Sequence, residues 1–414
     1  MMGRPVRYGG EFGGFNERAS YMAEIAAQAL ADIEVSDDGA FHRYIRRVPH
    51  GVVFVVAPWN YPYMTAINTV APALIAGNAV VLKHATQTLL VGERMARAFH
   101  AAGVPEAVFR NVFLDHDTTS ALISEGQFDF VNFTGSVGGG KAMERAAAGT
   151  FTGLGLELGG KDPGYVMEDA DLDAAVDTLI DGAMFNSGQC CCGIERIYVH
   201  ESLFDAFVEK AVAIVKGYRL GDPLDPETTI GPMANARFAA EVRAQISEAL
   251  EAGATAHIDT FAQDDGGTYL TPQILTGVSH DMRVMRDESF GPVVGIMPVR
   301  DDAEAIALMN DSPFGLTASL WTADVARAAR IGDEDDGHFC VVALCEGVEQ
   351  WRARLRAHAV VKRVFDGVRF LFFGHRHLIP SVQAYAHAKL CEIIQGGLSC
   401  LGFGGFFRAS CAAA

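Results

Sequence analysis

Short apolar runs alternate with longer stretches of helical periodicity in the part of the chain that follows Gly51. A short apolar run bounded by turn residues indicates a buried strand, and apolar residues spaced three and four apart indicate an amphipathic helix. The pattern therefore predicts strands and helices in regular alternation. In chain order these are a strand at 52–56, a helix at 65–76, a strand at 79–83, a helix at 89–102, a strand at 111–114, a helix at 118–124, a strand at 128–133 and a helix at 139–148.

Because each predicted strand is followed by a helix and then by another strand, these segments form successive βαβ units. Such units imply a parallel sheet with helices on both faces, so the predicted fold class is α/β. Ligands of sheets of this kind bind at the carboxyl edge, where the strands end. The segments that follow the predicted strands at this edge are 57–62, 83–86 and 133–136.

A second region of alternating pattern extends over about 160–333. It contains predicted helices at 172–183 and 203–216 and a strand-like run at 291–299. Together these elements indicate a second α/β domain.

The chain therefore divides into a first domain at 1–159, a second domain at 160–333 and a final segment at 334–414 whose fold we do not predict. Within the first domain, residues 40–49 alternate partially with a period of two and carry Arg on one side. This pattern predicts a strand outside the main sheet. We expect it to act as an oligomerisation arm between identical subunits.

Composition and charge narrow the class of function. The chain has 414 residues, of which half are apolar, so it can bury a large core. Its formal net charge of -18 argues against a nucleic-acid or anionic-membrane surface, because both need clustered Lys and Arg. The chain has no N-terminal apolar stretch typical of a signal peptide and no run near the roughly 18 apolar residues of a membrane span. We expect a cytoplasmic protein that acts on small molecules.

Cys191 and Glu157 are the candidate chemical groups. Cys191 lies in a run of small and thiol residues at 185–193, and Glu157 lies about thirty positions upstream, within 156–161. A thiol in an electropositive, partly exposed pocket becomes a thiolate, and a nearby carboxylate can activate water against a thioester. The pair therefore predicts covalent acyl chemistry.

The adjacent cysteines allow another interpretation, because free Cys also packs as a small hydrophobe in a buried patch. Gly188 and Gln189 immediately before them are poor residues for the centre of a buried strand, which weakens that interpretation. Adjacent cysteines do not provide the spaced pairs of a zinc site, so we expect no metal. They are also awkward for disulfides, which favours a reducing compartment.

Polar residues at the predicted carboxyl edge have two interpretations each. The Asn60 amide can donate a hydrogen bond to an oxyanion, or it can form an Asx turn. Lys83 is either a strand-end residue that reaches solvent or a cation for ribose and phosphate oxygens. Gly135 and Ser136 open a helix whose N–H groups can hold a phosphate, although glycine also simply ends strands.

Taken together and in order, these segments resemble the aldehyde dehydrogenase superfamily. The resemblance runs from about residue 10 to residue 333 and implies a Rossmann-like cofactor domain followed by a catalytic α/β domain. The matching segments are 58–62 (Pro-Trp-Asn-Tyr-Pro), Lys83, 133–136 (Phe-Thr-Gly-Ser), 156–161 (Leu-Glu-Leu-Gly-Gly-Lys), 188–191 (Gly-Gln-Cys-Cys), 288–292 (Glu-Ser-Phe-Gly-Pro) and 310–316 (Asn-Asp-Ser-Pro-Phe-Gly-Leu).

The resemblance implies a role for individual residues. Cys191 is the expected nucleophile, Glu157 the general base, and Asn60 an oxyanion donor alongside the backbone N–H of Cys191. Glu288 is expected to hold the nicotinamide ribose, and Phe290 to pack against the nicotinamide region. The residues expected to bind cofactor are Pro58, Trp59, Lys83, Thr86, Gly135, Ser136, Leu158, Glu288 and Phe290. The missing G-x-G-x-x-G fingerprint agrees with the atypical dinucleotide binding of this family.

The implied reaction oxidises an aldehyde to a carboxylic acid with NAD(P)+ through a cysteine thiohemiacetal and thioester. Two alternatives stay open: a catalytically impaired relative that only binds nucleotide, and an enzyme that passes the acyl group to coenzyme A. Thr86 stands where many members carry an acidic residue that bonds the adenosine ribose. A carboxylate there would repel the extra phosphate of NADP and a threonine would not, so both NAD and NADP are allowed.

The resemblance ends near Asp333, and the start of the chain is shorter than in the family. Residues 334–414 are richer in Arg, His, Phe and Cys, and the abrupt change favours a shifted reading frame or a mis-spliced gene model as their origin. Spacing in this segment fits no strong zinc pattern. Its cysteines and histidines considered for this purpose are Cys340, Cys345, His375, His377, Cys391 and Cys400.

Overall fold

The computed structural model describes residues 2–334 and 339–344, with side chains as far as Gly332. The chain divides into two compact units. Among the described residues, the N-terminal unit comprises 11–157, and the C-terminal unit comprises those up to Gly10 together with those from Leu158 to Leu344. Each unit has its own sheet and its own core.

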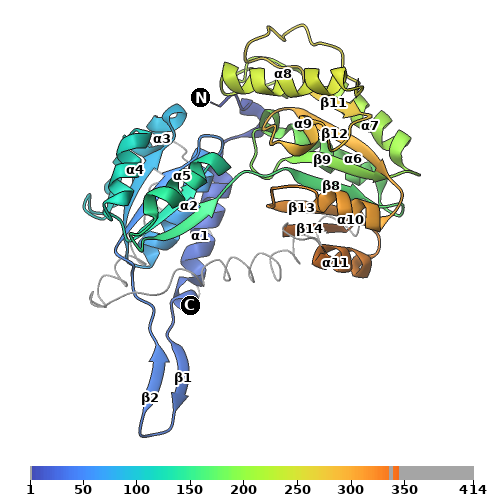
Figure 1. The fold of residues 1–414 in the computed structure, drawn as a ribbon. Helices are drawn as coiled ribbons and strands as arrows, with labels where there is room; N and C mark the ends of the chain where they lie inside the picture. The colour runs from blue at the N-terminus through green and yellow to red at the C-terminus, as the bar shows by residue number, and fades with distance from the viewer. Residues whose placement is uncertain (1, 335–338, 345–414) are drawn as a thin grey trace, which may run out of the picture. The chain divides into compact units, whose positions relative to one another are not determined.

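A five-stranded parallel sheet forms the centre of the N-terminal unit (Figure 1). Its strands are β3 (Val52–Ala57), β4 (Ala79–His84), β5 (Phe109–Val112), β6 (Phe130–Thr134) and β7 (Gly153–Glu157), in the spatial order β5-β4-β3-β6-β7. The chain proceeds outward from β3 to β5 and then returns to the other side of β3 through β6. In a doubly wound sheet, ligands bind at the carboxyl ends of the strands where the order reverses, here between β3 and β6.

Helices cover both faces of this sheet. They are α1 (Phe12–Ala29), α2 (Pro62–Ile75), α3 (Leu89–Ala101), α4 (His116–Ser124) and α5 (Val137–Ala147). Apolar residues of α1, α2 and α3 form one core with β3 and β4. Right-handed crossovers place α4 and α5 on the opposite face, where the rings of Phe54 and Phe128 stack with centroids 4.3 Å apart.

The structure confirms the predicted alternation of strands and helices, although several boundaries shift by two or three residues and one strand is added. The third strand begins at Phe109 rather than at residue 111. Strand β7 was not predicted, because Gly153 and Gly155 interrupt any apolar run there. A Cβ added at Gly153 would lie 2.7 Å from the ring of Phe130, so the glycine makes room for this neighbouring side chain.

The predicted strand at 40–49 belongs to an antiparallel hairpin. Strand β2 (His42–Ile45) pairs with β1 (Ile33–Asp37), which the sequence pattern did not reveal. Every residue of both strands is exposed, so the hairpin buries no face in its own unit. Figure 1 shows it extending away from the sheet of that unit.

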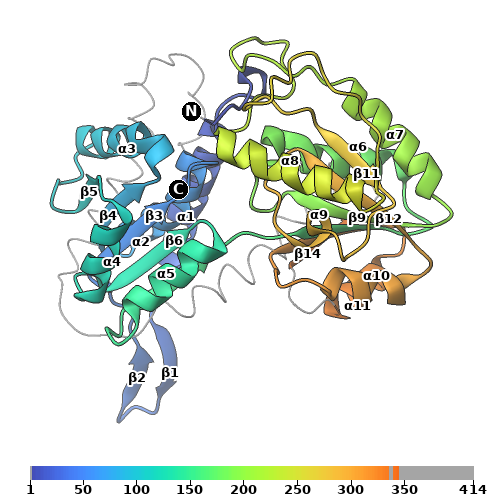
Figure 2. The same cartoon turned by 45° about the horizontal axis from the view of Figure 1, so that its top comes forward.

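A seven-stranded sheet forms the centre of the C-terminal unit, as Figure 2 shows from a second direction. All neighbouring strands are parallel except for the antiparallel pair β10–β11. In spatial order the strands are β10 (Thr255–Ala256), β11 (Gln273–Thr276), β12 (Val293–Val299), β9 (Ile194–His200), β8 (Asp162–Val166), β13 (Thr317–Thr322) and β14 (Phe339–Leu344).

Two hydrophobic cores lie on the two faces of this sheet. One core contains α6 (Leu172–Met184) and α7 (Phe204–Lys216), which confirm the helices predicted at 172–183 and 203–216. The other contains residues of α8 (Ala236–Glu251), α9 (Arg283–Arg286), α10 (Asp302–Asn310) and α11 (Val325–Glu334). The strand-like run at 291–299 is observed as β12.

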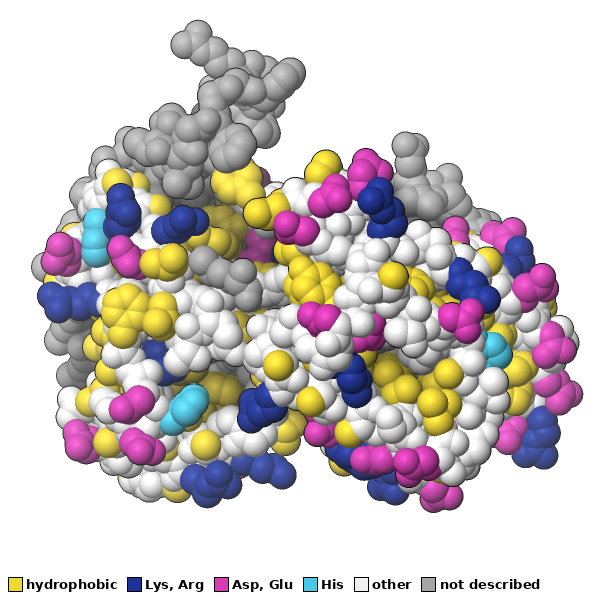
Figure 3. Space-filling model, turned by 90° about the horizontal axis from the view of Figure 1, so that it is seen from above, with side chains coloured by type: hydrophobic (Ala, Val, Ile, Leu, Met, Phe, Trp, Pro, Cys, Tyr) yellow, Lys and Arg dark blue, Asp and Glu magenta, His cyan; other side chains and the backbone are white. Residues whose placement is uncertain are grey.

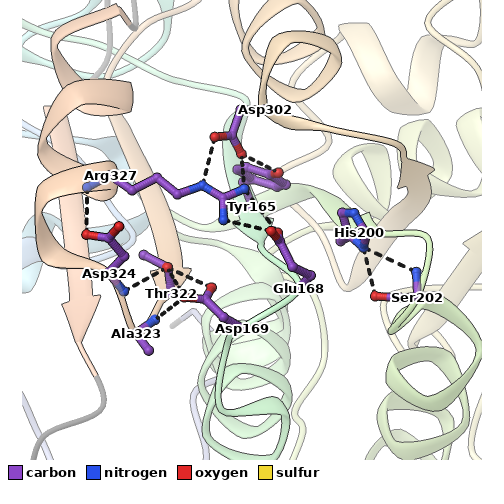
Figure 4. A network of polar contacts seen from close by, with 10 residues as sticks. All are labelled: Tyr165, Glu168, Asp169, His200, Ser202, Asp302, Thr322, Ala323, Asp324 and Arg327. Atoms are coloured by element: carbon purple, nitrogen blue, oxygen red, sulfur yellow. Dashed lines mark hydrogen bonds and ion pairs between the residues drawn. The ribbon is translucent and has the colours of Figure 1, made fainter.

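An ion-pair network joins helices α10 and α11 to the loop after β8 (Figure 4). The Arg327 guanidinium donates to both carboxylate oxygens of Glu168, at 2.9 and 3.0 Å, and to both oxygens of Asp302, at 2.8 and 2.6 Å. Asp302 also accepts a hydrogen bond of 2.9 Å from the Tyr165 hydroxyl. These bonds fix the last described helix against the sheet.

The first residues of the chain pack on the C-terminal unit, which corrects their assignment to a first domain at 1–159. The Val6 amide donates to the carbonyl oxygen of Pro223 at 2.8 Å, and the Tyr8 hydroxyl donates to the carbonyl oxygen of Thr229 at 2.8 Å. The Tyr8 ring also contacts the Phe185 ring edge-on, with centroids 5.2 Å apart. Long-range hydrogen bonds of this kind leave no periodic signal in the sequence.

Only strand β14 of the predicted tail is described, and its backbone pairs in parallel with β13. The histidines and cysteines from Cys345 to Cys400, whose spacing fits no strong zinc pattern, lie outside the described residues. None of the helices in the described part of the chain has the length and apolarity that a membrane crossing requires. On the face drawn in Figure 3, described Lys and Arg side chains are interspersed with Asp and Glu.

Candidate active site

Lys83 lies at the carboxyl edge of the five-stranded sheet, next to last in β4 and in register with Val56 and Val112. Only 4% of the residue is exposed. The hydrogen bond that its ammonium donates to the carbonyl oxygen of His84 is long, at 3.5 Å. Burial lowers the pKa of this ammonium, while the charge of Asp115 opposes the shift. A buried cation with so weak a partner fits an oxygen-rich ligand such as a ribose or a phosphate.

Asn60 lies in the turn between β3 and α2, at the same edge of the sheet. It is buried, Pro58 before it is also buried, and Trp59 is half-buried. The Glu11 carboxylate accepts hydrogen bonds from the Tyr63 and Met64 amides, at 2.7 and 2.8 Å. Because these are amides of the first turn of α2, Glu11 caps this helix and fixes the turn that carries Asn60.

Ser136 is the N-cap of α5, where its hydroxyl accepts a hydrogen bond of 3.2 Å from the Gly139 amide. A Cβ at Gly135 would lie 2.7 Å from the ring of Phe133, and one at Gly139 would lie 2.5 Å from it. These two glycines are therefore explained by the packing of Phe133. Phosphate binding at the start of α5 stays a prediction.

Glu157 ends β7, in register with Thr134 of β6. Its carbonyl oxygen accepts a hydrogen bond of 3.0 Å from the Gly135 amide. Although part of the residue is exposed, burial raises the pKa of its carboxyl above the ordinary value. That direction suits a group that must accept a proton near neutral pH.

Thr86 and His84 follow Lys83 in different surroundings. Thr86 is exposed in the short 3-10 helix at Thr86–Thr88, and its hydroxyl donates to the Gln87 side chain at 3.2 Å. His84 is buried, and neither of its ring nitrogens has a hydrogen-bond partner among the described residues. Burial and the charge of Lys83 lower the pKa of His84 to about 4, so the ring is neutral at physiological pH.

The candidate nucleophile follows a turn with an unusual backbone. Asn186, Ser187 and Gly188 have φ values of 54°, 57° and 70°, the left-handed region that non-glycine residues rarely adopt. The Ser187 hydroxyl donates to the carbonyl oxygen of Gly231 at 2.7 Å, and the Gln189 amide group donates to that of Asn186 at 3.0 Å. Backbone strain that is held in this way is typical of functional sites.

Cys190 and Cys191 are half-buried and Cys192 is exposed. The sulfur atoms of Cys190 and Cys192 are 3.6 Å apart. Hydrogen bonding to Cys190 and burial raise the pKa of the Cys191 thiol, although hydrogen bonding to Cys192 opposes this. The expected partial exposure is observed, but the expected electropositive surroundings are not. The protonated thiol of Cys191 is therefore favoured in these surroundings.

Glu288 lies against the glycine segment that follows Glu157. The Gly160 amide donates to the Glu288 carboxylate at 3.3 Å, and a Cβ at Gly159 would lie 2.1 Å from the same oxygen. Burial and the neighbouring charge of Glu195 raise the pKa of Glu288 to about 7. A Cβ at Gly160 would lie 3.3 Å from the carbonyl oxygen of Cys191. Gly159 and Gly160 are thus packed closely against the Glu288 carboxylate and the Cys191 backbone.

The C-terminal unit therefore brings together three segments that are far apart in sequence, at 158–161, 188–192 and 288–292. Leu158 and Phe290 are half-buried within them, and Phe290 has a positive φ of 49°. The N-terminal unit separately brings Asn60, Lys83, Ser136 and Glu157 to one edge of its sheet.

Sequence reasoning missed a group of buried polar residues behind the Glu288 segment. They are Lys161, Glu195, Gln245 and Ser289. Lys161 stands in one of the recognised motifs but had no role assigned to it. The local signal for Glu195 is weak, because it is one of the two adjacent charges, with Arg196, near the start of the buried strand β9.

Known proteins match the chain over most of its length. The family model described as "Aldehyde dehydrogenase family" matches residues 6–337. An NADP(+) succinate-semialdehyde dehydrogenase of Mycolicibacterium paratuberculosis (strain ATCC BAA-968 / K-10) is 36% identical over 316 residues, which are 76% of this chain and 67% of that protein. The 2-hydroxymuconic semialdehyde dehydrogenase of Pseudomonas putida is 35% identical over 396 residues, which are 94% of this chain and 79% of that protein.

Solved structures show the same likeness. The NAD-dependent aldehyde dehydrogenase from Sinorhizobium meliloti matches with a TM-score of 0.78 and 33% identity, covering 84% of this chain and 70% of that one. The succinic semialdehyde dehydrogenase from Streptococcus pyogenes in complex with NADP+ matches with a TM-score of 0.75 and 31% identity, covering 80% of this chain and 73% of that one. The α/β fold class is thereby confirmed.

Proposed function

Because the chain belongs to the aldehyde dehydrogenase family, we propose that Cys191, Glu157 and Asn60 carry out its reaction. The chain is an oxidoreductase that oxidises an aldehyde to a carboxylic acid with NAD or NADP. The observation that carries the residue assignment is the packing of the Cys191 loop against the glycine segment 158–160 and the Glu288 carboxylate.

The residues of the N-terminal edge fit the adenosine and phosphate part of a dinucleotide. Buried Lys83 offers a cation with a weak internal partner, and neutral His84 beside it adds no second charge. Glu288 and Phe290 of the C-terminal unit would hold the nicotinamide end. Pro58, Trp59, Thr86, Gly135, Ser136 and Leu158 complete the proposed cofactor set. When bound, the nicotinamide supplies a hydride acceptor.

The protein side chains would perform the remaining steps. Glu157 is the base that activates the hydrolytic water, and the raised pKa of its carboxyl favours proton uptake at neutral pH. The Cys191 thiolate attacks the aldehyde carbon and forms a thiohemiacetal. The Asn60 amide donates a hydrogen bond to its oxyanion, an interaction whose removal typically costs about 3 kcal/mol of transition-state stabilisation. Oxidation leaves a thioester on Cys191, which water activated by Glu157 hydrolyses.

Two variants test the assignment in a rapid-mixing assay of reduced-cofactor absorbance. Cys191→Ala should form no reduced cofactor, because no covalent adduct can form. Glu157→Gln should give a burst of reduced cofactor and then little turnover, because oxidation can proceed while hydrolysis cannot. Steady turnover at the parent rate by either variant would exclude the assigned role. Product analysis with and without coenzyme A separates hydrolysis from acyl transfer.

We propose a semialdehyde as the substrate, supported by the two relatives whose names carry this substrate class. Succinic semialdehyde and 2-hydroxymuconic semialdehyde are the first compounds to assay, each with NAD and with NADP. Exposed Thr86 supports acceptance of NADP, since it brings no negative charge to meet the extra phosphate. Equal rates with unsubstituted aldehydes would argue against this preference.

We also propose that the protein forms a homo-oligomer in the cytoplasm. The fully exposed hairpin β1–β2 supports association, because exposed apolar side chains such as Val35 and Phe41 have no cover in their own unit. The free thiols of Cys190, Cys191 and Cys192 agree with a reducing compartment. Sedimentation of the parent and of a Val35→Asp, Phe41→Asp variant tests the role of the hairpin, since a smaller species is expected for the variant.

A further inference from the structure

The Glu195 carboxylate binds the backbone of the segment that carries Glu288 and Phe290. One carboxylate oxygen accepts a hydrogen bond of 2.7 Å from the Ser289 amide, and the other accepts one of 2.8 Å from the Phe290 amide. Glu195 is only 4% exposed, so both bonds are shielded from water. A buried anion that accepts hydrogen bonds from two backbone amides fixes the conformation of that backbone.

Lys161 supplies the positive charge that pairs with the Glu195 carboxylate. Its ammonium donates to the Glu195 carboxylate at 2.7 Å and to the Ser289 hydroxyl at 2.8 Å, and the residue is fully buried. The Ser289 hydroxyl donates in turn to the Gln245 side chain at 2.7 Å. Lys161 is itself held, because Arg196 donates to its carbonyl oxygen at 2.8 Å.

The same network connects the nucleophile to the Glu288 segment. Glu195 follows Cys191 by four residues and stands at the start of β9. A Cβ at Gly188, just before the thiols, would lie 2.1 Å from the carbonyl oxygen of Gly291. The two loops therefore touch backbone to backbone on one side and are joined through the Glu195 carboxylate on the other.

We propose that Glu195, with Lys161 as its counter-charge, is a positioning residue that sets the Glu288–Phe290 turn relative to Cys191. The inference rests on the proposed function, in which that turn holds the nicotinamide ribose and ring. A buried ion pair alone is a weak source of stability, because desolvation offsets much of the attraction. What distinguishes this pair is its bonding to the two amides that directly follow Glu288.

The test separates positioning of the cofactor turn from stability of the fold. Glu195→Gln keeps the size of the side chain but removes the charge, so it weakens the two amide bonds and leaves Lys161 unpaired. The double variant Glu195→Gln, Lys161→Met also removes the unpaired buried charge, which should relieve the folding penalty. Glu168→Gln is the control, because it removes one carboxylate from the Arg327 network of the same unit (Figure 4).

Three kinetic measurements and one of stability are needed for each protein. The kinetic ones are the steady-state constants for NAD with the aldehyde that the parent oxidises fastest, the isotope effect with deuterium at the aldehyde carbon, and the hydrolysis of p-nitrophenyl acetate. The ester needs a reactive thiol and hydrolysis of the acyl group but no hydride acceptor, so it reports on Cys191 and Glu157 independently of the cofactor. Thermal unfolding reports on the fold.

We expect both Glu195 variants to lose at least tenfold in kcat and to show a larger isotope effect, because oxidation becomes slower. Ester hydrolysis should stay within about twofold of the parent in the double variant, and the control should match the parent in all three kinetic measurements. The inference is overturned if the double variant regains both stability and kcat, or if the Glu195 variants behave like the control. A parent that neither oxidises aldehydes nor hydrolyses the ester would instead refute the proposed function, and this inference would fall with it.

Discussion

The raised pKa of Glu288 makes cofactor binding depend on pH in a defined way. Its carboxyl titrates at about 7, because burial and the charge of Glu195 disfavour the anion. The proposed role needs the anion, which accepts hydrogen bonds from ribose hydroxyl groups. A group with this pKa is roughly one-tenth ionised at pH 6 and nine-tenths ionised at pH 8. The dissociation constant for the cofactor should therefore fall about tenfold between these two pH values.

Calorimetric titration of the Cys191→Ala protein measures this constant without turnover. NAD is the ligand to use, because the extra phosphate of NADP titrates near pH 6 and would add its own dependence. His84 does not interfere, since its pKa of about 4 keeps it neutral throughout. Glu288→Gln should bind NAD more weakly at pH 8 and show little change with pH. A pH dependence that is the same in both proteins would refute the role of Glu288.

For three further perturbations the structure predicts the direction of the effect. Gly188→Ala should lower the free energy of unfolding by more than the ~1 kcal/mol that an alanine with left-handed backbone angles costs, because its Cβ would also overlap the carbonyl oxygen of Gly291. Gly13→Ala is the control, because its Cβ would meet open space, so chemical denaturation should show it to be neutral or stabilising. Thr86→Glu should weaken NADP binding roughly tenfold while NAD binding changes little, as paired titrations would reveal. Glu288 favours folding in its protonated form, so the parent should lose stability relative to Glu288→Gln as the pH rises from 4.5 to 7, and unfolding at several pH values should show that loss.

The regular strands and helices were predictable because burial is encoded locally. Strand β3 is buried along nearly its whole length, and its run of valines leaves little choice but a buried strand. The carboxyl-edge positions of Asn60, Lys83 and Ser136 follow from the same alternation. The general base was harder to place, because β7 is rich in glycine and has no apolar run to reveal it.

The supporting residues of the site could not be predicted from local pattern. Lys161 and Glu195 are 34 positions apart, and Glu195 reaches Ser289 across 94. No periodicity links such positions, since they lie on different strands and loops that only the fold brings together. The packing of residues 2–8 on the C-terminal unit escaped prediction for the same reason. The raised pKa of Cys191 also depends on how neighbouring side chains fold against it.

The glycines explain how the segments of a site without the usual dinucleotide fingerprint can still pack closely together. At Gly159 the space of a side chain is taken by the Glu288 carboxylate, and at Gly188 by the backbone of Gly291. In both places glycine brings one functional segment of the C-terminal unit against another. At Gly135 and Gly139 the neighbour is instead the ring of Phe133. At these positions glycine therefore marks contacts within the protein, and a search for glycines that approach a phosphate directly would overlook the pairs that shape the site.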